Sequence, residues 1–92
     1  MNVRFYATYR AIVGAKSIEV SIPAGATVRQ LITETIQRFP PLGSELLDEH
    51  GELHRHVHVF INGRDTYYLP ENMETVLDAQ DTIDIFPPVA GG

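Results

Sequence analysis

The sequence predicts one α+β domain, in which a mixed β-sheet carries a single main helix on one face. The length of 92 residues is that of one small domain, and the hydrophobic fraction of 43% is ordinary for a globular protein. Stretches near both ends alternate apolar and polar residues, as half-buried strands do. One segment between them has instead the 3.6-residue period of an amphipathic helix. Strands on both sides of one helix indicate a helix that lies over a single sheet.

Two strands are expected before residue 23. Within residues 3–10 every second residue is apolar or aromatic, and the expected inward set is Val3, Phe5, Ala7 and Tyr9. The glycine-containing stretch AIVGAK then turns the chain. Apolar residues alternate again in SIEVSIP until Pro23, which ends the second strand. The two strands are therefore expected to form a hairpin.

The main helix is expected to begin after Thr27. Thr27 and Gln30 have the spacing of a capping box, in which each residue satisfies a backbone N–H of the other. The apolar residues that follow share one helical face and are Val28, Leu31, Ile32, Ile36 and Phe39. Pro40 disfavours helical geometry in the residue before it, so the helix should end near Phe39. A short helical turn capped by Ser44 is expected next, closed by Gly51.

Further strands complete the sheet. Their expected inward-facing residues are Val57, Val59, Ile61, Ile83 and Ile85. Asn62-Gly63 is a strong tight-turn signal between two extended stretches. If the helix is the crossover, the right-handed rule places the last strand, TIDIF, beside the first and parallel to it. This order of elements is that of a β-grasp, or ubiquitin-like, fold over residues 1–86.

Residues 87–92, PPVAGG, are expected to form a flexible tail. Two prolines cannot continue a sheet ladder and favour an extended exit, and the residues after them are small. An enzyme that activates a carboxylate with ATP must draw it through a narrow slot, where glycine has no Cβ to collide. The tail therefore predicts formation of an acyl-adenylate with release of pyrophosphate. That anhydride can accept sulfide, giving a thiocarboxylate, or a lysine amine, giving an isopeptide.

Composition excludes several other kinds of chemistry. There is no cysteine, which removes disulfides, thiolate metal sites and a cysteine nucleophile. The net charge of −5 disfavours a nucleic-acid partner. The seven glycines are dispersed without P-loop spacing, so no bound cofactor is expected and ATP would belong to a partner. The N-terminal residues resemble neither a signal peptide nor a membrane span, which predicts a cytoplasmic protein.

The chain resembles the MoaD/ThiS branch of ubiquitin-like sulfur carriers, and within it the small archaeal modifier proteins. The resemblance rests on the ending FPPV, a small residue and GG, and on the segment GELHRHVHVFINGRD. Carriers of the mycobacterial cysteine-biosynthesis type also end in VAGG and have a similar LHR segment. The resemblance implies a substrate rather than an enzyme, with Gly92, preceded by Gly91, adenylated by a ubiquitin-activating-like adenylyltransferase. It further implies either thiocarboxylation, with the large subunit of molybdopterin synthase as one partner, or conjugation to protein lysines.

A partner surface is expected beside the tail. Four aromatic side chains are out of phase with the buried set, namely Tyr6, His58, Phe60 and Phe86. If the first, central and last strands are neighbours, these four form one exposed patch. The tail residues expected to enter the partner are Pro87, Pro88, Val89 and Ala90. The alternative is that the aromatic side chains cap edges of the core.

Two other features carry weaker hypotheses. His54, His56 and His58 would share one face of a strand, but His54 and His58 would then lie about 13 Å apart, too far to share one metal ion, so no metal site is expected. Lys16 is the only lysine and hence the one side-chain acceptor for self-conjugation. The functions left open are a non-covalent β-grasp interaction module with an inert tail and a small metal-dependent enzyme built on the histidines.

Overall fold

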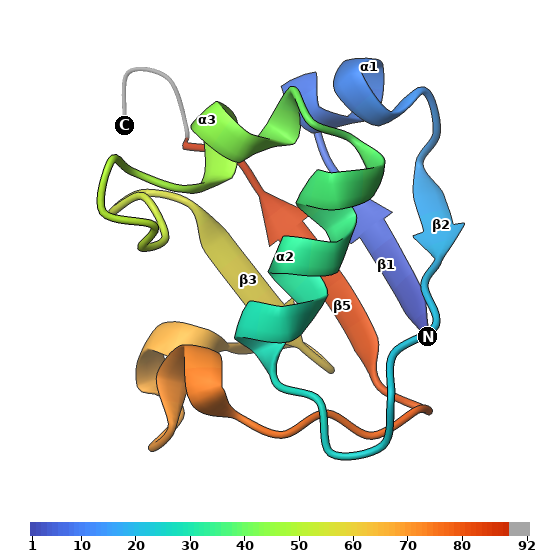
Figure 1. Cartoon of the computed structure of the whole chain (residues 1–92), viewed down its shortest axis with the longest axis vertical. Helices are drawn as coiled ribbons and strands as arrows, with labels where there is room; N and C mark the ends of the chain where they lie inside the picture. Colours follow the sequence, from blue (N-terminus) through green and yellow to red (C-terminus); the bar gives the residue numbers. More distant parts are fainter. Residues whose placement is uncertain (89–92) are drawn as a thin grey trace.

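The computed structural model describes residues 1–88, which form a mixed sheet crossed by one long helix (Figure 1). The strands are β1 (Asn2–Phe5), β2 (Ser17–Glu19), β3 (His58–Ile61), β4 (Arg64–Asp65) and β5 (Thr82–Phe86). The α-helices are α1 (Thr8–Val13), α2 (Val28–Arg38) and α3 (Leu42–Leu46). Two 3₁₀ turns, η1 (Thr66–Tyr68) and η2 (Asn72–Glu74), lie between β4 and β5.

The strand order is β2-β1-β5-β3-β4, so the last long strand lies in the middle of the sheet. β5 pairs in parallel with β1, with Val3 opposite Ile83, and antiparallel with β3, with Val59 opposite Ile85. The hairpin of β1 and β2 is antiparallel. The expected position of the last strand is therefore confirmed, and the architecture is the predicted β-grasp.

The first strand is shorter than the sequence predicted. β1 ends at Phe5, and Thr8–Val13 form helix α1 instead of continuing the strand. Ala7 takes a φ of 50°, which redirects the chain, and it is exposed rather than buried. Tyr9 is nevertheless only 1% exposed, because the helix turns its ring back into the core. Alternation alone cannot distinguish the two arrangements, since Tyr9 is buried in both.

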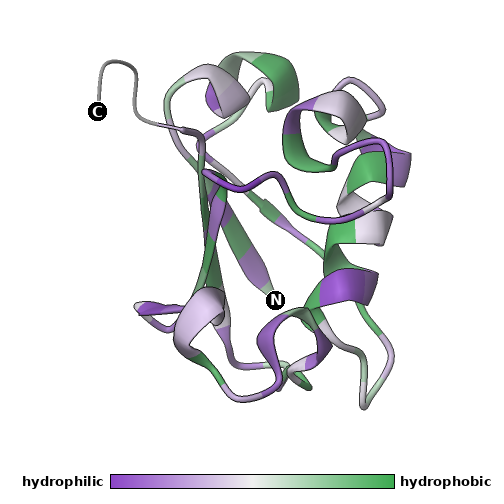
Figure 2. Cartoon of the chain, turned by 90° about the vertical axis from the view of Figure 1, so that its left-hand side faces the viewer, coloured by the Kyte–Doolittle hydropathy of each residue, from purple (hydrophilic) through white to green (hydrophobic). Residues whose placement is uncertain are grey.

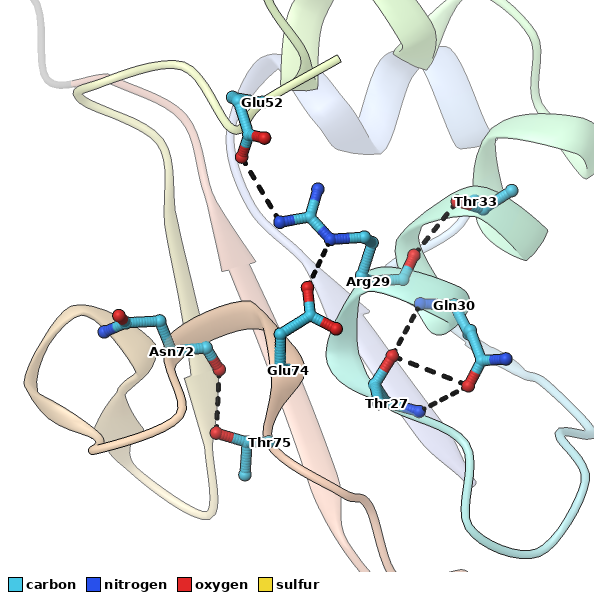
Figure 3. Close-up of polar contacts among 8 residues, drawn as sticks. All are labelled: Thr27, Arg29, Gln30, Thr33, Glu52, Asn72, Glu74 and Thr75. Atoms are coloured by element: carbon cyan, nitrogen blue, oxygen red, sulfur yellow. Dashed lines mark hydrogen bonds and ion pairs between the residues drawn. The ribbon is translucent and has the colours of Figure 1, made fainter.

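Helix α2 has the predicted start and end. The Thr27 hydroxyl accepts the Gln30 N–H at 3.3 Å, and the Gln30 carbonyl oxygen accepts the Thr27 N–H at 2.8 Å, completing the capping box (Figure 3). The helix ends at Arg38, with Phe39 as its C-cap. Its buried residues are Val28, Leu31, Ile32 and Thr35.

The short helix after it differs from the prediction. α3 begins at Leu42, so Ser44 lies inside the helix and Pro41 occupies the N-cap without a side-chain hydrogen bond. Proline suits this place because its fixed φ is compatible with a helix start and its missing N–H costs no bond there. Leu42 and Leu46 are fully buried against the core, one turn apart.

The core lies between the sheet and the helices. The side view in Figure 2 shows α2 and the strands as two layers. The inward residues of β1, β3 and β5 meet the apolar face of α2. The five residues of the later strands that were expected to face inward are at most 7% exposed, namely Val57, Val59, Ile61, Ile83 and Ile85. Across residues 1–88, none of the helices has the length and apolar character needed to cross a membrane.

Candidate functional site

The sheet face opposite α2 presents the alternate residues of the three central strands. The register places Arg4 of β1 and Phe60 of β3 on either side of Asp84 in β5. His58 lies opposite Phe86 in the same way. Because successive strand residues point to opposite faces, these side chains share the face away from the helix. We call it the open face.

Four aromatic residues form a continuous patch on the open face, the aromatic surface, defined as Tyr6, His58, Phe60 and Phe86. The Tyr6 and Phe86 rings stack with centroids 4.2 Å apart, and Phe60 meets Phe86 edge-on at 5.2 Å. The ring centroids of His58 and Phe60 lie 6.4 Å apart. All four are half-buried. The predicted contiguity is confirmed, whereas the role of the patch in binding a partner stays a prediction.

A buried carboxylate supports this patch, and the sequence reasoning did not find it. Asp84 is 6% exposed and accepts hydrogen bonds from Arg4 Nε at 2.6 Å and Nη2 at 2.9 Å. It also accepts one from the Tyr6 hydroxyl at 2.7 Å. Burial raises the pKa of the Asp84 carboxyl, but the hydrogen bonds from Arg4 and Tyr6 and the charge of Arg4 outweigh it and leave the pKa below its ordinary value. The network holds Tyr6 in place over Phe86.

A second polar group borders the aromatic surface on the other side. His58 Nδ1 lies 2.7 Å from Asp65 Oδ2, and the imidazole and Tyr67 rings are nearly perpendicular with centroids 5.4 Å apart. A shallow hollow of about 270 Å³ opens here, lined by His58, Phe60, Asp65, Phe86 and Pro87. The hollow therefore adjoins the first residue of the predicted tail.

The tail leaves from the end of the central strand. β5 ends at Phe86, and Pro87 and Pro88 follow it directly. Pro87 is half-buried and Pro88 is exposed. The remaining predicted tail residues, Val89, Ala90, Gly91 and Gly92, lie outside the described residues. The described part of the chain thus places the aromatic surface and the root of the tail at one end of β5.

The family assignment follows from comparison of the whole chain. The model of the ThiS family matches residues 3–92. The chain belongs to the ThiS family. Small archaeal modifier protein 3 of Haloferax volcanii is 39% identical to this ThiS-family chain over 92 residues, which cover 100% of the chain and 98% of the relative.

Solved structures agree with the fold of this ThiS-family chain. The crystal structure of SAMP1 from Haloferax volcanii has a TM-score of 0.87 at 26% identity, covering 99% of this chain and 97% of that one. A chain of the BexX/CysO complex of Amycolatopsis orientalis has a TM-score of 0.82 at 32% identity, covering 99% of this chain and 98% of that one. ThiS-family chains are small protein modifiers or sulfur carriers and are not themselves enzymes. The prediction that the chain is a modifier or sulfur carrier, and not an enzyme, is therefore confirmed.

The histidine run of this ThiS-family chain does not have the predicted arrangement. β3 begins at His58, and a turn at residues 54–57 precedes it, so the three imidazoles do not share one strand face. His54 Nε2 lies 3.0 Å from the Ser44 carbonyl oxygen, while His58 pairs with Asp65. Within residues 1–88 there is no group of three or more His, Cys, Asp or Glu side chains placed to hold a metal ion.

Lys16, the candidate acceptor of this ThiS-family chain, lies at the edge of the sheet. Lys16 is exposed just before β2, and its carbonyl oxygen accepts the Phe5 N–H at 2.8 Å. Its role as an acceptor of a conjugated copy stays a prediction.

On the helix side of the sheet, Arg29 pairs with Glu74 at 2.6 Å and with Glu52 at 3.2 Å, beside a hollow of about 490 Å³ (the ion pairs are drawn in Figure 3). This pairing ties α2 to η2 and to the loop before β3.

Proposed function

We propose that this chain acts through the α-carboxylate of Gly92, which a ubiquitin-activating-like adenylyltransferase converts to an acyl-adenylate. A carboxylate oxygen attacks the α-phosphorus of ATP, the new C–O–P linkage forms, and pyrophosphate leaves. A sulfide donor then displaces AMP to give a thiocarboxylate, or a lysine amine displaces AMP to give an isopeptide. The chain is the substrate in each step, and ATP is bound by the enzyme.

One observation carries this proposal: the aromatic surface and the root of the tail share one end of β5. An enzyme that handles a short tail needs a surface to hold beside it, and half-buried aromatic side chains suit such an interface because they offer large contact area at low entropic cost. Tyr6 and Phe60 each pack against Phe86, the residue directly before Pro87. A firm hold there would present the last residues to the ATP site in a repeatable orientation.

The comparisons support the same reaction class. The family match extends through residue 92, and the relative in Haloferax volcanii is named a modifier protein. One of the similar solved structures is a complex of two proteins, BexX and CysO. For this chain we propose the adenylyltransferase as the first partner in the cytoplasm. The second partner is a sulfur acceptor such as the molybdopterin synthase large subunit, or a set of protein lysines that includes Lys16 of another copy.

Removal of Gly92, or of Gly91 and Gly92, tests the proposal. The truncated proteins should give no ATP–pyrophosphate exchange with the activating enzyme, while circular dichroism and the melting temperature stay unchanged. Exchange at the full-length rate by the truncated chain would refute the proposal. A control chain with Gly43→Ala, a glycine without a positive φ where an added Cβ would come no closer than 3.4 Å to its nearest neighbour, tests whether loss of exchange is specific to the tail.

Intact mass spectrometry of protein from its native cell distinguishes the products. A thiocarboxylate adds about 16 Da, because sulfur replaces one carboxylate oxygen, whereas conjugation yields species heavier by a whole acceptor protein. The aromatic surface also fits a non-covalent interaction module with an inert tail. That alternative predicts partner binding that survives removal of both glycines and no modified carboxylate.

A further inference from the structure

The structure assigns to His58 the role of a preoriented hydrogen-bond acceptor, through Nε2, for a donor on the activating adenylyltransferase. This inference rests on the proposed function. The partner group it fits is a side chain with an apolar body and one N–H or O–H donor, of the kind that tyrosine and tryptophan supply. The body would fill the hollow beside Pro87, and the donor would meet the imidazole.

The tautomer of His58 follows from its neighbour. An ionised carboxylate can only accept hydrogen bonds, so the 2.7 Å contact with Asp65 Oδ2 requires the proton of the neutral imidazole to lie on Nδ1. Nε2 then carries a lone pair. The side chain of Asp65 is 10% exposed and that of His58 is 42% exposed, so the carboxylate is mostly covered and the imidazole is accessible.

The imidazole is also held in position by groups that are themselves fixed. Asp65 uses its other oxygen, Oδ1, to accept the Tyr67 N–H at 3.0 Å, which caps η1. The Tyr67 ring packs nearly perpendicular to the imidazole of His58, and its hydroxyl donates to the carbonyl oxygens of His54 and Arg55 at 3.0 and 3.1 Å. A side chain fixed in this way loses little entropy when it binds a partner.

The surroundings determine which partner group fits. The hollow is lined by Phe60, Phe86 and Pro87 together with the His58–Asp65 pair, so one polar pair interrupts an apolar wall. Its volume of about 270 Å³ lies below the roughly 300 to 1,000 Å³ of pockets that hold cofactors or drug-sized ligands, so it suits a single side chain. Asp84, the nearby carboxylate on the open face, is already engaged by Arg4 and Tyr6. His58 is therefore the group on this wall that selects a donor.

Substitution of Asp65 tests the tautomer directly. In Asp65→Asn the carbonyl oxygen can still accept the Tyr67 N–H, but the amide N–H₂ must donate to His58 Nδ1. The proton then moves to Nε2, and the acceptor becomes a donor with little change of shape. Long-range ¹H–¹⁵N correlation spectra at pH 8 should show Nε2 unprotonated in the unmodified chain and protonated in Asp65→Asn. A protonated Nε2 in the unmodified chain would overturn the inference.

Kinetics with the adenylyltransferase test the role. We expect His58→Phe and Asp65→Asn each to raise the KM for this chain about tenfold in ATP–pyrophosphate exchange, with kcat changed less than twofold, because a donor on the partner is left unpaired. His58→Gln, which can place an amide oxygen near the position of Nε2, should recover part of the loss. His50→Phe, on an exposed loop, should leave KM unchanged.

The outcomes separate this inference from the proposed function. If the unmodified chain supports no exchange, the proposed function fails. If it supports exchange and neither His58→Phe nor Asp65→Asn alters KM, the inference alone fails. Melting temperatures of the four variants show whether any of them has lost its fold, and the spectra of the unmodified chain remain decisive if His58→Phe does not fold.

Discussion

The two faces of the sheet differ in what their side chains contact. On the face toward α2, apolar residues meet apolar residues, and Val3, Ile83 and Ile85 are fully buried. On the open face, aromatic rings are only half-buried, and each polar side chain beside them has a specific partner, as Asp84 has Arg4 and Asp65 has His58. The first face is organised for stability through burial alone. The second keeps accessible aromatic area in a fixed arrangement, which is what a recognition surface requires.

The largest expected effect belongs to the helix-covered face. Leu31→Ala should lower the free energy of unfolding by about 3 kcal/mol, since Leu31 is fully buried and its truncation leaves a cavity. At a temperature where the variant is folded, KM for adenylation should be unchanged. Urea unfolding and exchange kinetics measure the two quantities. Glu34→Ala, on the exposed side of the same helix, is the control and should change neither.

The open face should show the opposite pattern. Phe60→Ala is expected to weaken binding to the activating enzyme by about 2 kcal/mol, a factor of about 30, because a central aromatic residue of an interface carries much of its energy. The cost in folding stability should be about 1 kcal/mol, since Phe60 is half-buried. Titration calorimetry and urea unfolding test this pair of values. A stability loss larger than the binding loss would remove the distinction between the faces.

Asp84 lies on the open face, but its substitution should act on folding stability, with a smaller effect than that of Leu31→Ala. Asp84→Asn should lower stability by about 1 to 2 kcal/mol at neutral pH, because the charge-assisted bonds from Arg4 are weakened.

The same carboxyl should also give an acid-dependent loss of stability. Its pKa in the folded chain lies below the ordinary value near 4, so its contribution is present above that value and is lost as pH falls through the folded pKa. The free energy of unfolding, measured by urea titration at several pH values between about 2 and 6, should therefore change less with pH in Asp84→Asn than in the unmodified chain. Parallel curves for the two proteins would contradict this role.

Several parts of the fold were predictable because their causes are local. Thr27 and Gln30 lie three positions apart, so the capping box could be read directly, and the structure confirms it. Asn62 and Gly63 have φ values of 51° and 82°, which the predicted tight turn requires. Period-two alternation was also sufficient to place the aromatic surface on one face, once the strand order was inferred.

The sequence alone determined the fold class, the central helix and which aromatic residues point away from the core, since periodicity, caps and turns act between residues a few positions apart. Only the tertiary structure decided that β1 ends at Phe5 and gives way to α1, that Asp84 is buried, and that Asp65 orients His58. Arg4 and Asp84 are 80 positions apart and meet only because β5 lies beside β1. Contacts of this kind depend on strand register and chain reversal, which no local pattern encodes.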